Sequence, residues 1–214
     1  LSKKYNDPFL IDLNNISFEV MEGEIFGIAG IAGNGQSELM NVLTGEEILN
    51  NSSKINFFGE DISKFGPKKR RDLSIAFVPE DRLGHSAIPE LSLSDNVLLS
   101  QYAGNKFSKW GIINKKNITT KTNNIIKDFN VVTTGSENYA GSLSGGNLQK
   151  FVIGREILSQ PKLLIISHPT WGIDAGAEYS IRESLIELSK NGTSIIVLSQ
   201  DLDELIEITH RIAV

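Results

Sequence analysis

A short apolar run followed at once by a glycine-rich loop constrains the fold of this chain more than any other segment. The run Ile25–Ala29 is almost continuously apolar, which is typical of a strand buried on both faces of a sheet. The sequence GIAGNGQS occupies positions 30–37, and a helix is expected to start at Ser37. A glycine loop between a strand and a helix is the context of a phosphate-binding loop, although plain strand-to-helix turns also need glycine. The segment therefore predicts either a phosphate site or a glycine turn.

Strand-like and helix-like patterns alternate along the rest of the chain. Apolar runs or alternation predict strands at 16–20, 55–57, 73–78, 163–166, 195–198 and from 211 onward. One-sided apolar spacing predicts helices that start at 37 and after 146, and others at 175–190 and 201–208. This alternation implies an α/β fold with a mostly parallel sheet that helices cover on both faces.

The chain is long enough for one well-cored domain, so residues 1–214 are assigned to a single domain. Residues from about 86 to 147 are polar and rich in Asn, Lys and Thr, with one amphipathic stretch around Ile125 and Phe129. We expect them to form a small, mostly helical subdomain inserted into a core of residues 1–85 and 148–214. The last residues, RIAV, have the pattern of a strand that is just starting, so we expect a piece of a longer protein.

Composition disfavours several classes of function. A formal net charge of −5 and a sequence pI near 5.3 argue against a nucleic acid as the main partner. Cysteine is absent, which rules out a disulfide scaffold, and the histidines show no spacing that suggests zinc. No apolar run approaches the roughly 20 residues that span a bilayer.

Further motifs follow the glycine loop in a characteristic order. They are LSGGN at 143–147, SHPT at 167–170, WGIDAGA at 171–177 and SQD at 199–201. In this order and spacing they resemble the ATP-binding domain of ABC transporters, over essentially the whole chain. The stretches GNGQSE at 33–38, VPEDR at 78–82 and LSLSDN at 91–96 look like the second, C-terminal ATP-binding half of tandem importer ATPases. That family serves simple sugars and nucleosides, and the resemblance leans to the nucleoside branch.

The resemblance implies an ABC ATPase core with an N-terminal antiparallel β portion, the inserted helical subdomain, and ATP with Mg²⁺ as ligands. Backbone N–H groups of the loop and the following helix would hold the phosphates. The candidates in the loop are Gly30, Gly33, Asn34, Gly35, Gln36, Ser37 and Glu38, with Ser37 as a weak Mg²⁺ ligand.

Gln36 stands where the family's phosphate loop has its lysine. At about 4 Å and an effective dielectric of about 20, the missing charge is worth up to about 4 kcal/mol before desolvation. A neutral hydrogen bond from Gln36 to a phosphate would contribute about 1 kcal/mol of binding free energy. We therefore expect nucleotide binding at this site to be weakened but not abolished.

Four other positions depart from the resembled pattern. Ser167 and His168 stand where ABC domains carry adjacent carboxylates for Mg²⁺ and for the attacking water. Gln200 stands where the switch histidine lies, and Glu80 where many relatives have glutamine, although Glu80 is common in the second-half branch. His168 is either a replacement base or a partly buried histidine that holds a loop. Together these changes predict little or no ATPase activity for the chain alone.

The signature motif, defined here as Ser144, Gly145, Gly146 and Asn147, is intact by contrast. A hydroxyl and backbone N–H groups at a helix start suit an anion. In ABC proteins this motif reads the γ-phosphate of ATP held by a partner domain, because two domains stack head to tail. Asp174 stands in the loop that crosses that interface. Both segments also have a plain interpretation as helix starts, with Asp174 as an N-cap.

The adenine ring is expected to stack on an aromatic side chain upstream of the loop. Tyr5 is the first candidate and Phe9 the second, with a tyrosine at a frayed terminus as the alternative. Trp110 and Trp171 are interpreted as packing or interface residues.

The resemblance also implies partners and a location. They are a sister ATP-binding domain in the same protein, two membrane permease subunits gripped by residues 83–99, and indirectly an extracytoplasmic solute-binding protein. The domain would lie peripherally on the cytoplasmic face of the cell membrane, without a nucleic-acid partner. Two alternatives stay open: a non-hydrolysing module that braces a partner ATPase domain, and a soluble ABC ATPase acting on DNA or ribosomes. The sequence names no solute.

Overall fold

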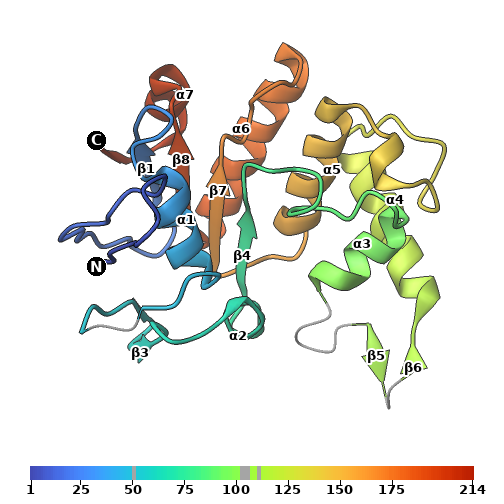
Figure 1. The fold of residues 1–214 in the computed structure, drawn as a ribbon. Coiled ribbons are helices and arrows are strands. Elements are labelled where there is room, and N and C mark those ends of the chain that lie inside the picture. Colours follow the sequence, from blue (N-terminus) through green and yellow to red (C-terminus); the bar gives the residue numbers. More distant parts are fainter. Residues whose placement is uncertain (50–51, 102–106, 110–111) are drawn as a thin grey trace.

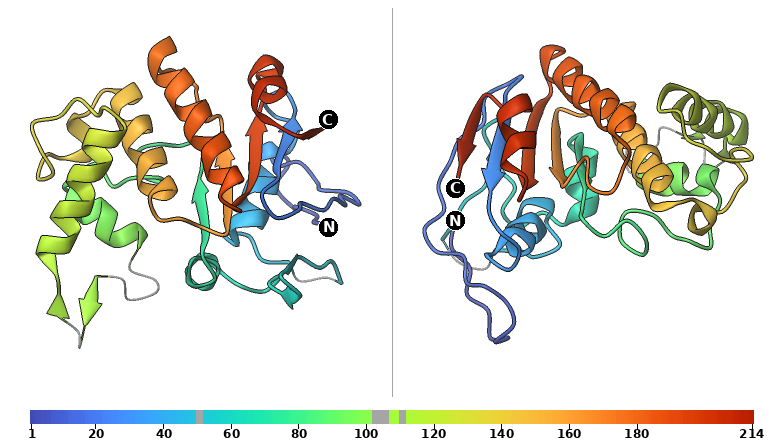
Figure 2. Two further views of the ribbon diagram at one scale, coloured as in Figure 1. Left: turned by 180° about the vertical axis from the view of Figure 1, so that it is seen from behind. Right: turned by 90° about the horizontal axis from the view of Figure 1, so that it is seen from above.

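The structure, a computed structural model, describes residues 1–49, 52–101, 107–109 and 112–214. A five-stranded sheet forms its centre, and helices cover both faces of that sheet (Figure 1). A further group of helices, α3, α4 and α5, lies beyond one edge of the sheet, and both views in Figure 2 show the same arrangement. The expected α/β class is confirmed.

All neighbouring strands of the central sheet are parallel, in the order β4-β7-β8-β1-β9. The strands are β1 (Ile25–Ala29), β4 (Ile75–Val78), β7 (Leu163–Ser167), β8 (Ser194–Ser199) and β9 (Arg211–Ala213). Because the five strands run in one direction, their C-terminal ends all lie at the same end of the sheet. The loops that follow β1, β4, β7 and β8 therefore gather along one line.

The other described elements surround this sheet. The helices are α1 (Gln36–Thr44), α2 (Pro67–Asp72), α3 (Leu93–Ser100), α4 (Lys115–Asp128), α5 (Gly145–Ile157), α6 (Ala175–Lys190), α7 (Leu202–Ile208) and the 3₁₀ turn η1 (Ala140–Ser142). Two small antiparallel pairs are β2 (Asn56–Phe57) with β3 (Glu60–Asp61), and β5 (Ser108–Lys109) with β6 (Ile112–Ile113).

Alternate residues of the central strands enter two separate hydrophobic clusters. Ile195 and Val197 of β8 pack in the cluster that includes residues of α5, α6 and α7. Ile196 and Leu198 pack in the opposite cluster, with residues of α1. Both faces of β8 are thus buried, which explains why its sequence is continuously apolar rather than alternating.

The predicted strand at 16–20 is not formed. Ile16, Phe18 and Val20 are half-buried while the residues between them are exposed. The alternation of apolar and polar residues in the sequence therefore predicted burial correctly, but not a strand. Phe18 stacks on Phe26 of β1, with ring centroids 5.1 Å apart. However, the segment borders a cavity of about 540 Å³ instead of a pairing strand, and a ladder needs a partner.

The region 86–147 contains α3, α4, η1 and the start of α5, in line with the helical content expected there. The β5–β6 pair was not predicted, since two residues a side carry no detectable periodicity. Trp110 lies outside the described residues. Whether this region behaves as a separate subdomain stays a prediction.

Among the described helices, none combines the length and the apolar composition of a transmembrane span.

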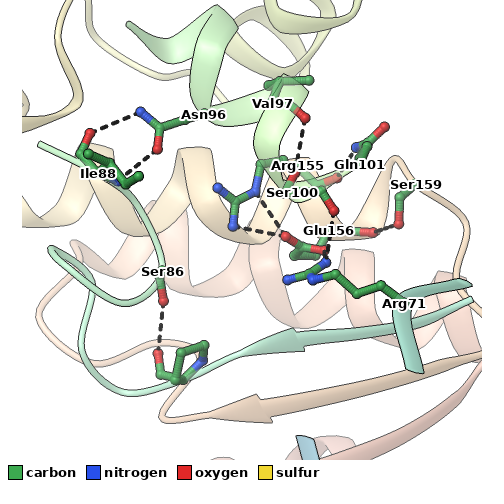
Figure 3. A network of polar contacts seen from close by, with 11 residues as sticks. Arg71, Ser86, Ile88, Asn96, Val97, Ser100, Gln101, Arg155, Glu156 and Ser159 are labelled. Atoms are coloured by element: carbon green, nitrogen blue, oxygen red, sulfur yellow. Dashed lines mark hydrogen bonds and ion pairs between the residues drawn. The ribbon is translucent and has the colours of Figure 1, made fainter. Parts of the chain in front are cut away.

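A buried ionic network joins this helical region to α2, the helix that precedes β4 (Figure 3). Glu156 of α5 pairs with Arg71 at 3.0 Å and with Arg155 at 2.9 Å. Burial alone would raise the pKa of Glu156, but the two guanidinium groups hold it below its ordinary value. Arg71 also donates to the carbonyl of Ser100, and Gln101 donates to the carbonyl of Arg155. The C-terminal end of α3 is thereby fastened to α2 and α5.

Arg70 holds the helix that follows the glycine loop. Its fully buried guanidinium donates to the carbonyls of Val42 at 2.8 Å and Leu43 at 2.5 Å in the last turn of α1. It also donates to the carbonyls of Ile62 and Phe65. Burial lowers the pKa of Arg70 to about 10, so the side chain stays charged at neutral pH. One side chain thus satisfies carbonyls that the end of α1 leaves open.

Arg70→Met is expected to lower the free energy of unfolding by about 3 kcal/mol or more, because several buried carbonyls lose a charged donor. Equilibrium urea denaturation measures this loss. The matched control is Lys68→Met on the same helix, where the exposed ammonium forms an i,i+4 pair with Asp72. That control should change stability by at most about 0.5 kcal/mol. Equal losses in the two variants would contradict the role assigned to Arg70.

Candidate functional site

The strand registers bring the sequence-predicted site segments together. Ala29 of β1 pairs with Ser199 of β8, and Ser167 of β7 pairs with Leu198. The glycine loop, the segment at His168 and the segment at Gln200 therefore leave the sheet side by side. Glu80 follows β4, which pairs with β7 and ends at the same edge. Glu80 and Gln200 are both exposed there.

The glycine loop has the backbone of an anion cradle. Gly33 and Gly35 adopt left-handed φ values of 83° and 94°, which glycine reaches without steric cost. Asn34 lies exposed between them. Within the described chain, no hydrogen bond uses the backbone N–H groups of Gly33, Gly35, Gln36, Ser37 and Glu38. Open donors at a helix N-terminus, with no side-chain cap, suit a phosphate.

The Gln36 side chain turns back to the sheet instead of extending from the loop. Its Nε2 donates to the carbonyl of Ile28 at 3.3 Å and to the carbonyl of Ser199 at 3.4 Å. A Cβ added at Gly30 would lie 3.2 Å from this nitrogen, so Gly30 leaves room for it. The amide therefore ties β1 to β8 beneath the loop and carries no charge toward its open side.

The N-terminal segment packs on the same loop. The buried carboxylate of Glu38 accepts the Ile11 N–H at 3.1 Å, so Glu38 holds this segment in place. The Tyr5 hydroxyl is buried without a partner among the described residues, and burial, followed by Glu47, raises the pKa of Tyr5 to about 12. Phe9 is 90% exposed. Phe9 thus offers the more open ring, and an adenine-stacking role for either residue stays a prediction.

His168 sits in a sharp turn at the end of β7. Its φ is 47°, its N–H donates to the carbonyl of Leu198 at 2.8 Å, and its ring packs edge-on against Trp171. The residue is buried, and so is Ser167 before it. Gln149 of α5 donates to the carbonyls of His168 and Pro169. These contacts favour the interpretation of His168 as a residue that holds the loop.

A buried carboxylate that was not predicted from the sequence links this turn to β8. Glu204 is 1% exposed and accepts the Thr170 hydroxyl at 2.6 Å and the Ser199 hydroxyl at 2.7 Å. Asp201 caps α7 three residues earlier, so the Asp-x-x-Glu spacing of a helix start was the available signal. Because Gln36 also bonds Ser199, one connected network holds the glycine loop, β8 and the segment after β7.

The signature motif lies at the start of α5. Ser144 is exposed and caps the helix, accepting from the side chain of Asn147 at 2.9 Å. The backbone N–H groups of Gly145 and Gly146 form no hydrogen bond with any described residue. A Cβ on Gly146 would lie 3.4 Å from the carbonyl oxygen of Gly172, so this glycine allows a close approach of the neighbouring loop.

Asp174 follows that loop and caps α6. Its exposed carboxylate accepts the Ala177 N–H at 3.0 Å, and this backbone bond lowers the pKa of Asp174. The cap explains why α6 begins at Ala175. It also leaves the carboxylate at the surface next to the signature motif.

The two candidate phosphate surfaces are separated within the chain. The signature motif belongs to the helical group beyond β4, whereas the glycine loop follows β1, with β7 and β8 between these two strands (Figures 1 and 2). The chain therefore carries two separate candidate surfaces.

The residues present fit a triphosphate better than its metal. The loop N–H groups and the start of α1 suit phosphate oxygens. For Mg²⁺, the Ser37 hydroxyl is exposed at the right helix turn, but Ser167 and His168 add no carboxylate. Within the described ranges there is no group of three or more His, Cys, Asp or Glu side chains that could hold a metal.

The parallel sheet and the strand–glycine loop–helix unit define an α/β domain of the phosphate-loop class. A family model described as ABC transporter matches residues 13–171. The chain is 38% identical over 204 residues to the nucleoside import ATP-binding protein NupA of Lactococcus lactis subsp. cremoris, covering 95% of the chain and 40% of NupA. It is 37% identical over 204 residues to the ribose import ATP-binding protein RbsA of that subspecies, covering 95% of the chain and 41% of RbsA. The chain belongs to the ABC transporter family.

A solved structure agrees on the fold. The dimeric structure of MJ0796, a bacterial ABC transporter cassette, has a TM-score of 0.83 at 21% identity and covers 99% of the chain and 90% of that structure. The chain spans about two fifths of the length of the two curated relatives, since it covers 40% and 41% of them.

Gln36→Lys is expected to tighten binding of Mg·ATP to this chain by about tenfold, because an ammonium adds part of the missing phosphate attraction. Calorimetric titration of the purified chain measures the change. Gln160→Lys is the matched control, since it adds the same charge at an exposed position before β7, at the opposite edge of the sheet. An equal gain in the control would attribute the effect to net charge, and no gain in Gln36→Lys would contradict the assignment of the loop.

Proposed function

We propose that this chain is an ATP-binding domain of an ABC importer for a sugar or a nucleoside. In this proposal its own nucleotide site is degraded, while its signature motif completes the ATP site of a sister domain. The observation that carries the proposal is the contrast between the two surfaces. The Gln36 amide is tied back to the sheet, whereas Ser144 is exposed and the N–H groups of Gly145 and Gly146 form no hydrogen bond with any described residue.

The degraded site follows from the side chains present. A bound triphosphate supplies an anhydride bond whose hydrolysis needs a cation at the phosphates and a base for water. The loop offers backbone N–H groups for binding, but Gln36 gives no charge. His168 is turned against Trp171, and losing a general base costs roughly 10²- to 10⁴-fold in rate. Weak binding with slow turnover is the expected outcome.

The partner site is supported by the geometry of the signature motif. Ser144 and the open N–H groups form a donor surface at the start of a 13-residue helix. Asp174 lies at the exposed start of α6, beside the loop that touches Gly146. MJ0796, which shares the fold, was solved as a dimer. We infer that a sister ATP-binding domain stacks on this face with the γ-phosphate of its ATP toward Ser144.

The transport role rests on the relatives. NupA is named for nucleoside import and RbsA for ribose import, at nearly equal identity to this chain. The solute class is therefore proposed as a sugar or a nucleoside, without a choice between them. Two membrane permease subunits, contacted by residues 83–99, and an extracytoplasmic binding protein complete the proposed assembly. The domain would act peripherally on the cytoplasmic face of the membrane.

A second candidate function is a non-hydrolysing module that only braces a partner ATPase domain. The tied-back Gln36 and the buried His168 favour it. The two candidates differ in one observable, because ATP promotes association with the sister domain only in the first. Sedimentation of the two domains with and without Mg·ATP distinguishes them.

Ser144→Arg in the full-length protein is expected to lower the steady-state ATPase rate by at least about 100-fold, because it fills the proposed γ-phosphate surface. The rate is measured over a range of ATP concentrations with Mg²⁺. Asn123→Arg places the same side chain on the exposed side of α4 and should leave the rate unchanged. A normal rate in the Ser144 variant would refute the proposed function.

A further inference from the structure

Arg82, which follows β4, lies where two parts of the proposed partner-facing surface meet. Its guanidinium donates to the carbonyl of Trp171, 89 residues away in the sequence. A Cβ on Gly145 would lie 3.1 Å from Nη1 of Arg82, and a Cβ on Gly172 would lie 3.4 Å from Nη2. The guanidinium is therefore fitted between the signature motif and the loop that leads to Asp174.

The two glycines of the signature motif leave space for different neighbouring groups. Gly145 leaves space for Arg82, whereas Gly146 leaves space for the carbonyl of Gly172 and for Ile173. Arg82, the start of α5 and the loop 171–173 thus form one packed junction. Asp174 follows this loop directly, so the junction sets the position of Asp174 relative to Ser144.

Hydrogen bonds within the segment 79–88 hold the backbone of Arg82 in place. The Arg82 carbonyl accepts the Ala87 N–H at 2.9 Å, and the Ser86 hydroxyl donates to the carbonyl of Pro79. Figure 3 shows the next link, in which the side chain of Asn96 in α3 accepts the Ile88 N–H at 2.8 Å and donates to the Ile88 carbonyl. The arginine is thus connected to the end of β4 and to α3.

Arg82 also brings a charge that no described carboxylate neutralises by an ion pair. Burial lowers the pKa of Arg82, but a guanidinium remains protonated at neutral pH. A cation beside open N–H groups favours an approaching anion. Lysine would keep this charge but lose the planar fork that reaches both sides of the junction.

We propose that Arg82 is a positioning residue that locks the signature motif to the loop 171–173. Ser144 is then presented to the γ-phosphate of a nucleotide held by the sister domain, and Asp174 is held beside it at the same partner-facing surface. This inference rests on the proposed function. It adds the residue that keeps the partner-facing surface in one arrangement and connects it to α3.

The test compares Arg82→Met and Arg82→Lys in the full-length protein. Arg82→Met is expected to lower kcat for ATP hydrolysis by about 10- to 100-fold, because misplacement near 1 Å costs this much. KM for ATP should change by less than about threefold, since the nucleotide first binds the sister domain's glycine loop. Arg82→Lys should recover part of kcat, because the charge returns. Thermal unfolding should be unchanged in both variants.

The control is Lys116→Met, which removes a positive charge from the exposed first turn of α4 and should leave kcat unchanged. An unchanged kcat in Arg82→Met would overturn the inference, as would parallel losses of kcat, ATP affinity and melting temperature. Ser144→Arg separates the two proposals. If it abolishes turnover while Arg82→Met does not, only the role of Arg82 fails. If neither variant affects turnover, the proposed function fails as well.

Discussion

The parallel pairing of β1 with β8 is the constraint on which the rest of the structure depends. Its register places Ala29 opposite Ser199, so the glycine loop leaves the sheet next to the end of β8. That proximity lets the Gln36 amide reach the Ser199 carbonyl. The Ser199 hydroxyl is held separately by Glu204, five residues further along the chain. A slip of one residue would turn Ile196 and Leu198 into the wrong hydrophobic cluster, and both faces of β8 are buried. The apolar clusters therefore determine the geometry of the polar edge.

The two candidate phosphate surfaces differ in which atoms would bind the phosphate. Chemistry at the glycine loop depends on side chains, a cation at position 36 and carboxylates at 167 and 168, and none of these is present. The signature motif would use two backbone N–H groups, which form no hydrogen bond with any described residue, and the exposed hydroxyl of Ser144, which also caps α5. Substitutions can therefore weaken the first surface without touching the second. This physical asymmetry supports the proposal that the domain completes a partner's nucleotide site while its own site is weakened.

Much of the fold was predictable from the sequence, for identifiable reasons. β7 and β8 are buried on both faces, so their continuous apolar runs predicted them. Asp174 before α6 and Asn191 after it mark both ends of that helix, as the caps confirm. The segment 16–20 was predicted wrongly, because alternation reports half-burial and not the presence of a partner strand. The β5–β6 pair escaped because its strands are too short to carry a period.

The sequence by itself determined the chemical inventory: a glycine loop after a buried strand, glutamine in place of its lysine, no carboxylates at 167 and 168, and an intact signature motif. These features depend only on residue identity and local order. Only the tertiary structure decided how the inventory is used. It turned Gln36 toward Ser199, buried Glu204 between Thr170 and Ser199, and fitted Arg82 between Gly145 and Gly172. Gln36 and Ser199 are 163 positions apart, Thr170 and Glu204 are 34 apart, and Arg82 and its partner Trp171 are 89 apart. Such separations close only when the strands pair and the hydrophobic clusters pack.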